Sequence, residues 1–291
     1  MLFGAAPETF VYFQIGSGLS GLSVLVLPPL FGDYWKFGLA YPVTVSVLLV
    51  VPFFFGFWPT AAAFLGLGVL HAIMDFRSFG AICVCLCFLL SLRALPRPTR
   101  KGLMIFGAVV VALMMPVITK KMFSNTGGRA DRSNVERSSM LSAAWEGFVE
   151  SPIIGNGSWF SNSKVMDNFL LIRAERERLS GGGLGFDNSE AGGASIHSQM
   201  LVALAEGGLF GATFFFCYGI FILWAIFFAL GDAAWHWTLP SRLFLLVNSF
   251  WDLWMSPFSG PVRINLALTV ILIAIYWRER EQLRTARLRQ R

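Results

Sequence analysis

Long apolar runs without a single charge constrain the fold of this chain more than any other feature. Residues 9–31 and 37–58 form uncharged runs of 23 and 22 residues. A helix rises about 1.5 Å per residue, so roughly 20 apolar residues cross a hydrocarbon layer of about 30 Å. Only 14% of the residues are charged, against about a quarter in an ordinary soluble domain. We therefore predict an all-α, polytopic membrane helical bundle.

Further apolar stretches bring the predicted number of spans to about eight. The predicted domains are 1–118 (five spans), 119–196 (a large helical loop between spans five and six), 197–277 (three spans) and 278–291 (a basic tail). The small residues at 5–7 precede the first run rather than follow it, so no signal peptide cleavage is expected. The remaining spans are predicted at 59–75, 78–92, 103–118, 208–230, 243–258 and 264–277.

Two basic clusters predict the orientation of the chain in the membrane. They lie at 93–101 and 278–291, each directly beside an apolar run. Basic residues that flank membrane spans stay in the cytoplasm, and both clusters place the 119–196 loop on the external side. The net charge of +6 therefore reflects topology and not binding to nucleic acid. We expect a multi-pass membrane protein whose 119–196 loop is external; in a Gram-negative bacterial cell the spans would lie in the inner membrane and the loop in the periplasm.

The sequence of the loop predicts two helices. Ser133 and Glu136 fit a capping box at a helix start, which places Arg137 in the first turn. Apolar residues then follow at helical spacing until Ser151 and Pro152 end the helix. A second helix is predicted over 165–179, with a C-terminal cap at Gly181.

A bend is predicted after the loop. From His197 to Asp232 is 35 residues, or about 52 Å of straight helix, which exceeds the hydrocarbon thickness. We therefore expect a break near Gly207 and Gly208, which would return His197 toward the membrane surface. Glu206 lies nine residues after His197 and could support the imidazole only if the helix bends.

Three basic residues are the first candidates for a site. Arg77 lies 16 residues before Arg93, about 24 Å of helix, which places it near the outer membrane boundary. It could pair with Asp75, or it could hold an anion. Arg137 and His197 map to the same side, and Asp252 with Arg263 forms a weaker pair of candidates.

Neither a metal site nor a cofactor is predicted. The four cysteines lie inside apolar runs, which argues against a disulfide framework and a cysteine zinc site. Asp187 and Glu190 are the only acidic pair close to His197 in the sequence. The glycine-rich tract at 181–193 follows no predicted strand, so it is not read as a nucleotide-binding loop.

Three stretches of the sequence resemble one superfamily. They are DFRSF around Arg77, RSSMLSAAWEGFVESPIIGNG from Arg137, and HSQMLVALAEGGLFG from His197. All three are similar to motifs of the bacterial O-antigen ligases and O-antigen polymerases, and the third is the most specific. The resemblance covers roughly residues 60–277. Members usually have around a dozen spans, so it also implies that N-terminal spans are missing here.

The resemblance implies a metal-independent glycosyltransferase of envelope polysaccharide or lipopolysaccharide biosynthesis. Its donor would be a saccharide linked to undecaprenyl diphosphate, a lipid-linked oligosaccharide, and its acceptor a glycan or lipid among the membrane lipids. Arginine forks suit the diphosphate and histidine suits a base. We therefore expect Arg77 and Arg137 to hold the diphosphate, with His197 assisting the acceptor hydroxyl.

Alternatives from other classes remain open at this stage. A transporter would need an ionisable group near the membrane midplane, and Asp252 is the one candidate, about 15 Å of helix past Arg242. A non-catalytic envelope scaffold would need none of the basic residues. Within the superfamily, ligase and polymerase share the same motifs.

Overall fold

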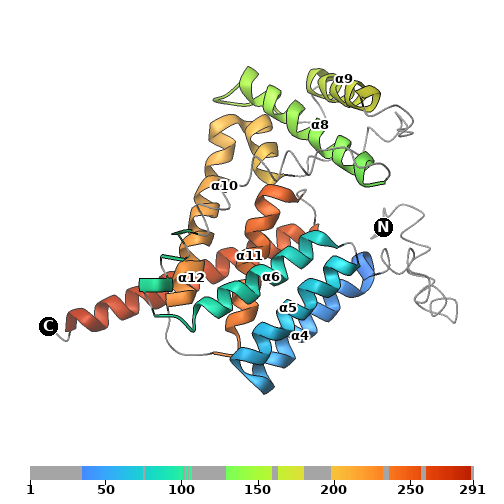
Figure 1. Ribbon diagram of the computed structural model, residues 1–291. Coiled ribbons are helices and arrows are strands. Elements are labelled where there is room, and N and C mark those ends of the chain that lie inside the picture. The colour runs from blue at the N-terminus through green and yellow to red at the C-terminus, as the bar shows by residue number, and fades with distance from the viewer. Residues whose placement is uncertain are drawn as a thin grey trace. The chain divides into compact units, whose positions relative to one another are not determined.

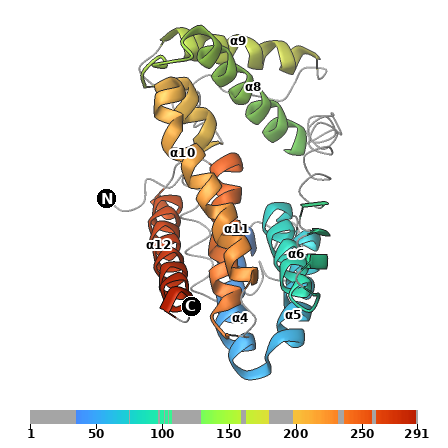
Figure 2. The same ribbon diagram turned by 90° about the vertical axis from the view of Figure 1, so that its left-hand side faces the viewer.

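The computed structural model describes most of the chain after its first 34 residues. The described ranges are 35–74, 76–96, 98–100, 102–103, 105–106, 129–158, 163–179, 198–231, 236–256 and 260–289. All regular structure in these ranges is helical, which confirms the all-α prediction. Figures 1 and 2 show the helices, and the chain divides into two compact units. The first unit comprises Met1–Ala94 and Asp232–Phe244, and the second Leu95–Gly231 and Leu245–Arg291.

The first unit contains apolar helices close to the predicted spans. A short π-helix, η1 (Trp35–Leu39), leads into α4 (Ala40–Phe55), which is followed by α5 (Phe57–Ile73) and α6 (Arg77–Leu92). The break between α4 and α5 lies at Gly56, whose φ is 74°. The predicted boundary at Trp58 and Pro59 was therefore three residues late. Proline is tolerated in a first helical turn, so Pro59 did not have to begin a helix.

A buried histidine joins α4, α5 and η1. Trp35 Nε1 donates to His71 Nδ1 at 3.0 Å. The ring must then carry its proton on Nε2, which lies 3.0 Å from Thr44 Oγ1, and that hydroxyl donates to the Ala40 carbonyl. All polar atoms of this chain of hydrogen bonds are satisfied, so His71 acts as a structural element of the unit.

Helices α5 and α6 pack through small residues, side by side in Figure 1. A Cβ at Gly80 would lie 3.0 Å from the Gly68 carbonyl oxygen, and one at Gly68 would lie 2.7 Å from Val84 Cγ2. Such close backbone approach is typical of helix pairs in membranes. It sets the position of the α6 N-terminus, where Arg77 lies.

The second unit contains the two helices predicted in the loop. Helix α8 (Arg129–Glu150) ends where Ser151 and Pro152 predicted, and α9 (Ser163–Leu179) covers the predicted 165–179. The capping box was wrong, because α8 begins at Arg129 and Ser133 lies inside it. Arg137 is thus in the interior of the helix and not in its first turn. The sequence before Ser133 is polar and helix-compatible, so propensity extended the helix beyond the local signal.

Helix α8 packs on both α9 and α10 (Gln199–Gly231), as Figure 2 shows. At one edge, Arg176 Nη2 donates to Ser142 Oγ at 2.7 Å. Burial lowers the pKa of the Arg176 guanidinium, and the neighbouring carboxylates of Glu175 and Glu146 oppose that shift. The shared core consists of Met140, Ala143, Ala144, Val165, Phe169 and Ala205.

Two further helices of the described residues are α11 (Leu239–Met255) and α12 (Gly260–Arg289). Helix α12 runs past the predicted end of its span at Trp277 and includes most of the basic tail. Side chains of the two helices meet in the second unit, where Ser249 and Thr269 share a hydrogen bond of 2.7 Å.

Among the described residues, α10 is the one helix long and apolar enough to cross a membrane. Helices α4 and α5 and most of α6 are apolar but have 16 or 17 residues each. The prediction of about eight spans stays a prediction, because spans one and five fall wholly or largely outside the described residues.

Candidate functional site

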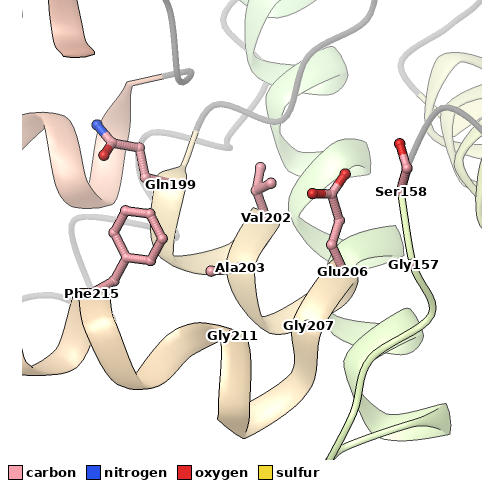
Figure 3. A pocket seen from close by; sticks show the side chains of 9 residues that line it. All are labelled: Gly157, Ser158, Gln199, Val202, Ala203, Glu206, Gly207, Gly211 and Phe215. Atoms are coloured by element: carbon pink, nitrogen blue, oxygen red, sulfur yellow. The ribbon is translucent and has the colours of Figure 1, made fainter.

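Helix α10 contains the break predicted from its glycine pair. Gly208 has φ 59° and ψ −153°, which is not a helical conformation. A Cβ at Gly211 would lie 3.0 Å from the Ala203 carbonyl oxygen, whereas eight residues of straight helix would separate these positions by about 12 Å. The helix therefore folds back into a first arm (residues 199–207) and a second arm (residues 209–231), visible in Figure 3.

The break would leave four backbone groups of the helix without their usual partners. In a continuous helix the N–H groups of Leu209 and Phe210 would bond the carbonyls of Ala205 and Glu206. Here the two N–H groups instead donate to Pro152 O at 2.8 Å and Ile153 O at 3.3 Å.

The two carbonyls are satisfied by the same segment of the loop. Asn156 N donates to Ala205 O and Gly157 N donates to Glu206 O, both at 2.9 Å. We call residues 152–157 the glycine turn and residues 205–210 the kink. Each segment completes the hydrogen bonding of the other, which is required of buried backbone groups.

This exchange needs glycine on both sides. A Cβ at Gly155 would lie 2.3 Å from the Glu206 carbonyl oxygen, and one at Gly208 would lie 2.4 Å from the Ile153 carbonyl oxygen. Both glycines also have positive φ, at 72° and 59°. The Gly-x-Gly turn after α8 and the glycine pair of α10, which are about 50 residues apart in the sequence, thus form one structural element.

A pocket of about 430 Å³ opens beside the kink. Figure 3 shows the side chains that line it. The first arm presents one stripe at helical spacing, and the second arm and the glycine turn close the other sides. The lining residues are Gly157, Ser158, Gln199, Val202, Ala203, Glu206, Gly207, Gly211 and Phe215. We call this the kink pocket.

The start of the first arm is fixed by two buried polar residues. The Leu201 N–H donates to Ser198 Oγ at 3.3 Å, as expected of a helix N-cap. Gln199 Nε2 donates to the carbonyl oxygen of Asp252 at 3.0 Å. These contacts anchor the segment that directly follows His197 in the sequence.

The structure places the predicted candidates as follows. Arg137 is exposed on α8, and Glu206 lines the kink pocket. Asp252 is buried on α11, where its carboxylate accepts hydrogen bonds from Asn248 and Ser256, while Arg263 is exposed on α12.

Two further candidates are only partly placed. Arg77 is the first residue of α6, in the first unit. His197 lies outside the described residues, as do Asp187 and Glu190. Within the described ranges, no group of three His, Cys, Asp or Glu side chains could hold a metal ion.

Sequence reasoning did not identify Gln199 and Ser158 as lining residues. The spacing of Gln199, Val202, Ala203 and Glu206 was visible in the sequence as one helical stripe. What it could not show is that the helix doubles back and that the glycine turn covers this stripe.

Comparison with known protein families identifies the family of the chain. The family model described as O-antigen ligase matches residues 61–216, more than half of the chain. No curated protein and no solved structure shows significant similarity. The matched region runs from α5 to the second arm of α10 and includes the glycine turn and the kink. The family and the apolar helices together indicate an integral membrane protein of the glycosyltransferase type. The chain belongs to the O-antigen ligase family.

Proposed function

We propose that the chain transfers a saccharide from an undecaprenyl-diphosphate donor to an acceptor hydroxyl at the periplasmic face of the inner membrane. The backbone exchange between the glycine turn and the kink supports this proposal most directly. It joins the end of α8, the helix that carries Arg137, to the first arm of α10. In the sequence that arm follows His197 and Ser198, so the exchange ties the helix of one candidate to the described segment that comes after the other.

In this reaction the acceptor oxygen attacks the anomeric carbon of the donor sugar, and the bond from that carbon to the diphosphate oxygen breaks. The proton of the acceptor hydroxyl passes to His197. Arg77 and Arg137 hold the diphosphate and stabilise the charge that develops on it. Because the diphosphate is already a good leaving group, the paired carboxylates of a glycoside hydrolase are not needed.

Saccharide transfer in proteoliposomes, with a chelator present, tests the proposal. We expect His197→Ala to slow turnover by a factor on the order of 10² to 10⁴, the usual range for a positioned base. Arg77→Lys and Arg137→Lys keep the charge but remove the planar fork, so transfer should fall through weaker donor binding. Arg178→Lys is the matched control, because Arg178 is an exposed arginine of α9 without an assigned role.

Two outcomes would contradict the mechanism. If His197→Ala transferred saccharide at the wild-type rate, His197 could not be the base, and loss of all transfer on adding the chelator would show that a metal is required.

The proposed orientation in the membrane has its own test. A cysteine introduced at Ser180 should react with an impermeant thiol reagent before the inner membrane is permeabilised.

The acceptor class is tested by deleting the gene and separating the envelope polysaccharides on a gel. Loss of a ligase leaves lipid-linked polymer unattached, whereas loss of a polymerase leaves single repeat units. Unchanged polysaccharides would count against both assignments.

A further inference from the structure

The second arm of α10 has an exposed apolar face along most of its length. Phe210, Phe214 and Phe221 are all exposed, and their spacing of four and seven residues places them on one side of the helix. From Leu209 to Gly231 is 22 residues without a charge, or about 33 Å of helix, close to the thickness of the hydrocarbon layer. The second arm therefore crosses the membrane, and this face contacts lipid.

The far end of the second arm has the features of a membrane boundary. On α12, the Arg280 guanidinium carbon lies 5.8 Å from the ring centre of Trp224 and 5.9 Å from that of Trp277. Arg100 donates a hydrogen bond to the Leu230 carbonyl oxygen. Indole rings and arginines collect where a span leaves the hydrocarbon. Counting about 20 helical residues back from Trp224 and Leu230 leads to the kink, which marks the opposite boundary.

The glycine turn lies at the same depth as the kink, because the Phe210 N–H donates to the Ile153 carbonyl oxygen at 3.3 Å. Ile153 and Ile154 are 60% and 73% exposed, and Trp145 and Val149, one turn apart on α8, are exposed as well. We call these four residues the turn patch. Large apolar side chains gathered on a surface in this way mark an interaction site.

We propose that the turn patch inserts into the interfacial layer of the lipid bilayer, beside the point where α10 enters the hydrocarbon. Lipid is the expected partner because the patch adjoins Phe210, which begins the lipid-facing side of the second arm. An indole such as that of Trp145 suits the level of the headgroups, and isoleucine side chains suit the outer hydrocarbon. Glu146 and Glu150 are exposed on α8, so the segment lies at the membrane surface and does not span the membrane.

This inference does not rest on the proposed glycosyl transfer. It would hold the end of α8, the helix of Arg137, at the depth where a lipid-linked substrate presents its headgroup. The loop between α8 and α10 would then be anchored to the bilayer by its own side chains and not only by the neighbouring spans.

Spin-label accessibility measures the depth of the turn patch. The full chain, with its four native cysteines replaced by alanine, receives Ile154→Cys or the matched control Leu171→Cys. Leu171 is a similarly exposed apolar residue, at 69%, but it lies on the charge-rich helix α9. Ile220→Cys, halfway along the second arm, is the reference for the hydrocarbon, and Thr285→Cys on α12 is the reference for water.

Each protein carries a nitroxide and is reconstituted in nanodiscs of phosphatidylethanolamine and phosphatidylglycerol. Collision rates are measured with oxygen, which concentrates in hydrocarbon, and with a water-soluble nickel chelate. We expect the oxygen-to-nickel ratio at position 154 to be several-fold above that at position 285 and below that at position 220. Position 171 should match position 285. Val149→Cys provides the same test if Ile154→Cys does not elute as a monodisperse protein.

Three outcomes would overturn the inference. A ratio at position 154 equal to that at position 285 would place the turn patch in water. Low collision rates with both reagents would mean that protein covers the patch, either a second copy or another part of the chain. A membrane-like ratio at position 171 would show that insertion does not depend on the kink. Saccharide transfer measured in parallel separates these results from a failure of the proposed function.

Discussion

Glycines allow close backbone approach in both units, but the α5–α6 pair and the kink use them differently. In the α5–α6 pair, Gly68 and Gly80 stay inside regular helices, and the missing side chains give the helices space. In the glycine turn and the kink, Gly155 and Gly208 both have positive φ, and the two segments exchange backbone hydrogen bonds. The first contact depends on the size of the side chain alone. The second depends on size, backbone conformation and hydrogen bonding together.

This difference bears on how each region can tolerate change. In the α5–α6 pair, where only the space between the helices is limited, a substitution can be accommodated by a small shift or by a smaller neighbouring side chain. Where the backbone itself is exchanged, no neighbouring side chain can be trimmed to make room, because the atoms in contact are carbonyl and amide groups. The region that carries the candidate site should therefore be the less tolerant one.

The largest effect is expected for Gly155→Ala and Gly208→Ala. Each puts a methyl group within 2.4 Å of a backbone oxygen at a positive φ. Relieving this clash opens the exchange, and the loss of its four backbone hydrogen bonds at about 1 kcal/mol each gives a destabilisation of about 4 kcal/mol. The free energy of unfolding can be measured by titrating the detergent-purified protein with dodecyl sulfate and following tryptophan fluorescence.

The double variant sharpens this prediction. Either substitution alone opens the same exchange, so the two effects should not add, and the double variant should be little worse than each single one. Full additivity would mean that the two glycines act independently. That result would refute the description of turn and kink as one element.

Sequence reasoning found the parts of this element but not their relation. The apolar runs predicted helices, and α6 and α9 begin and end within two residues of their predicted bounds. The glycine pair predicted the break in α10, because a straight helix of 35 residues would be longer than the hydrocarbon layer is thick. The sequence could not show that residues 152–157 stabilise the break. Hydrogen bonds between segments about 50 residues apart produce no periodic pattern in the sequence.

The errors have local causes as well. Ser133 and Glu136 matched a capping box, yet α8 starts four residues earlier because nothing in 129–132 opposes a helix. Arg137, Glu206 and Asp252 were singled out by residue type and by their positions in the sequence, and the structure shows one exposed, one lining a pocket and one buried. Their roles in a reaction stay predictions, as does that of His197.

A smaller effect is expected in the α5–α6 pair, where a second substitution should restore what the first removes. Gly68→Ala brings its methyl group 2.7 Å from Val84 Cγ2. We expect a net loss of about 1 to 2 kcal/mol from overpacking, reduced by the higher helix propensity of alanine. Val84 is 45% exposed, so Val84→Ala should recover more than half of the loss in the same unfolding titration.

Gly80→Ala is the matched control, because its closest contact is the backbone oxygen of Gly68, at 3.0 Å. Truncating Val84 should not rescue it. If Val84→Ala restored the stability of both variants equally, the restoration would reflect a general loosening of the helix pair and not the removal of the contact with Val84 Cγ2.

The smallest effects come from the two remaining glycines of the turn and kink, which separate backbone conformation from contact. Gly157 has φ 76°, but a Cβ at this position would have no atom within 4 Å. A Cβ at Gly207, which has a helical conformation, would also have no atom within 4 Å. Gly157→Ala should therefore cost about 1 kcal/mol, the penalty of a left-handed conformation alone. Gly207→Ala should be neutral or stabilising by up to about 1 kcal/mol, because alanine favours a helix.

Both free energies of unfolding come from the same titration, and the order of the two variants is the critical result. If Gly157→Ala were as damaging as Gly155→Ala, conformation alone would account for the intolerance of the turn, and the close approach of Gly155 to the Glu206 carbonyl would lose its proposed importance.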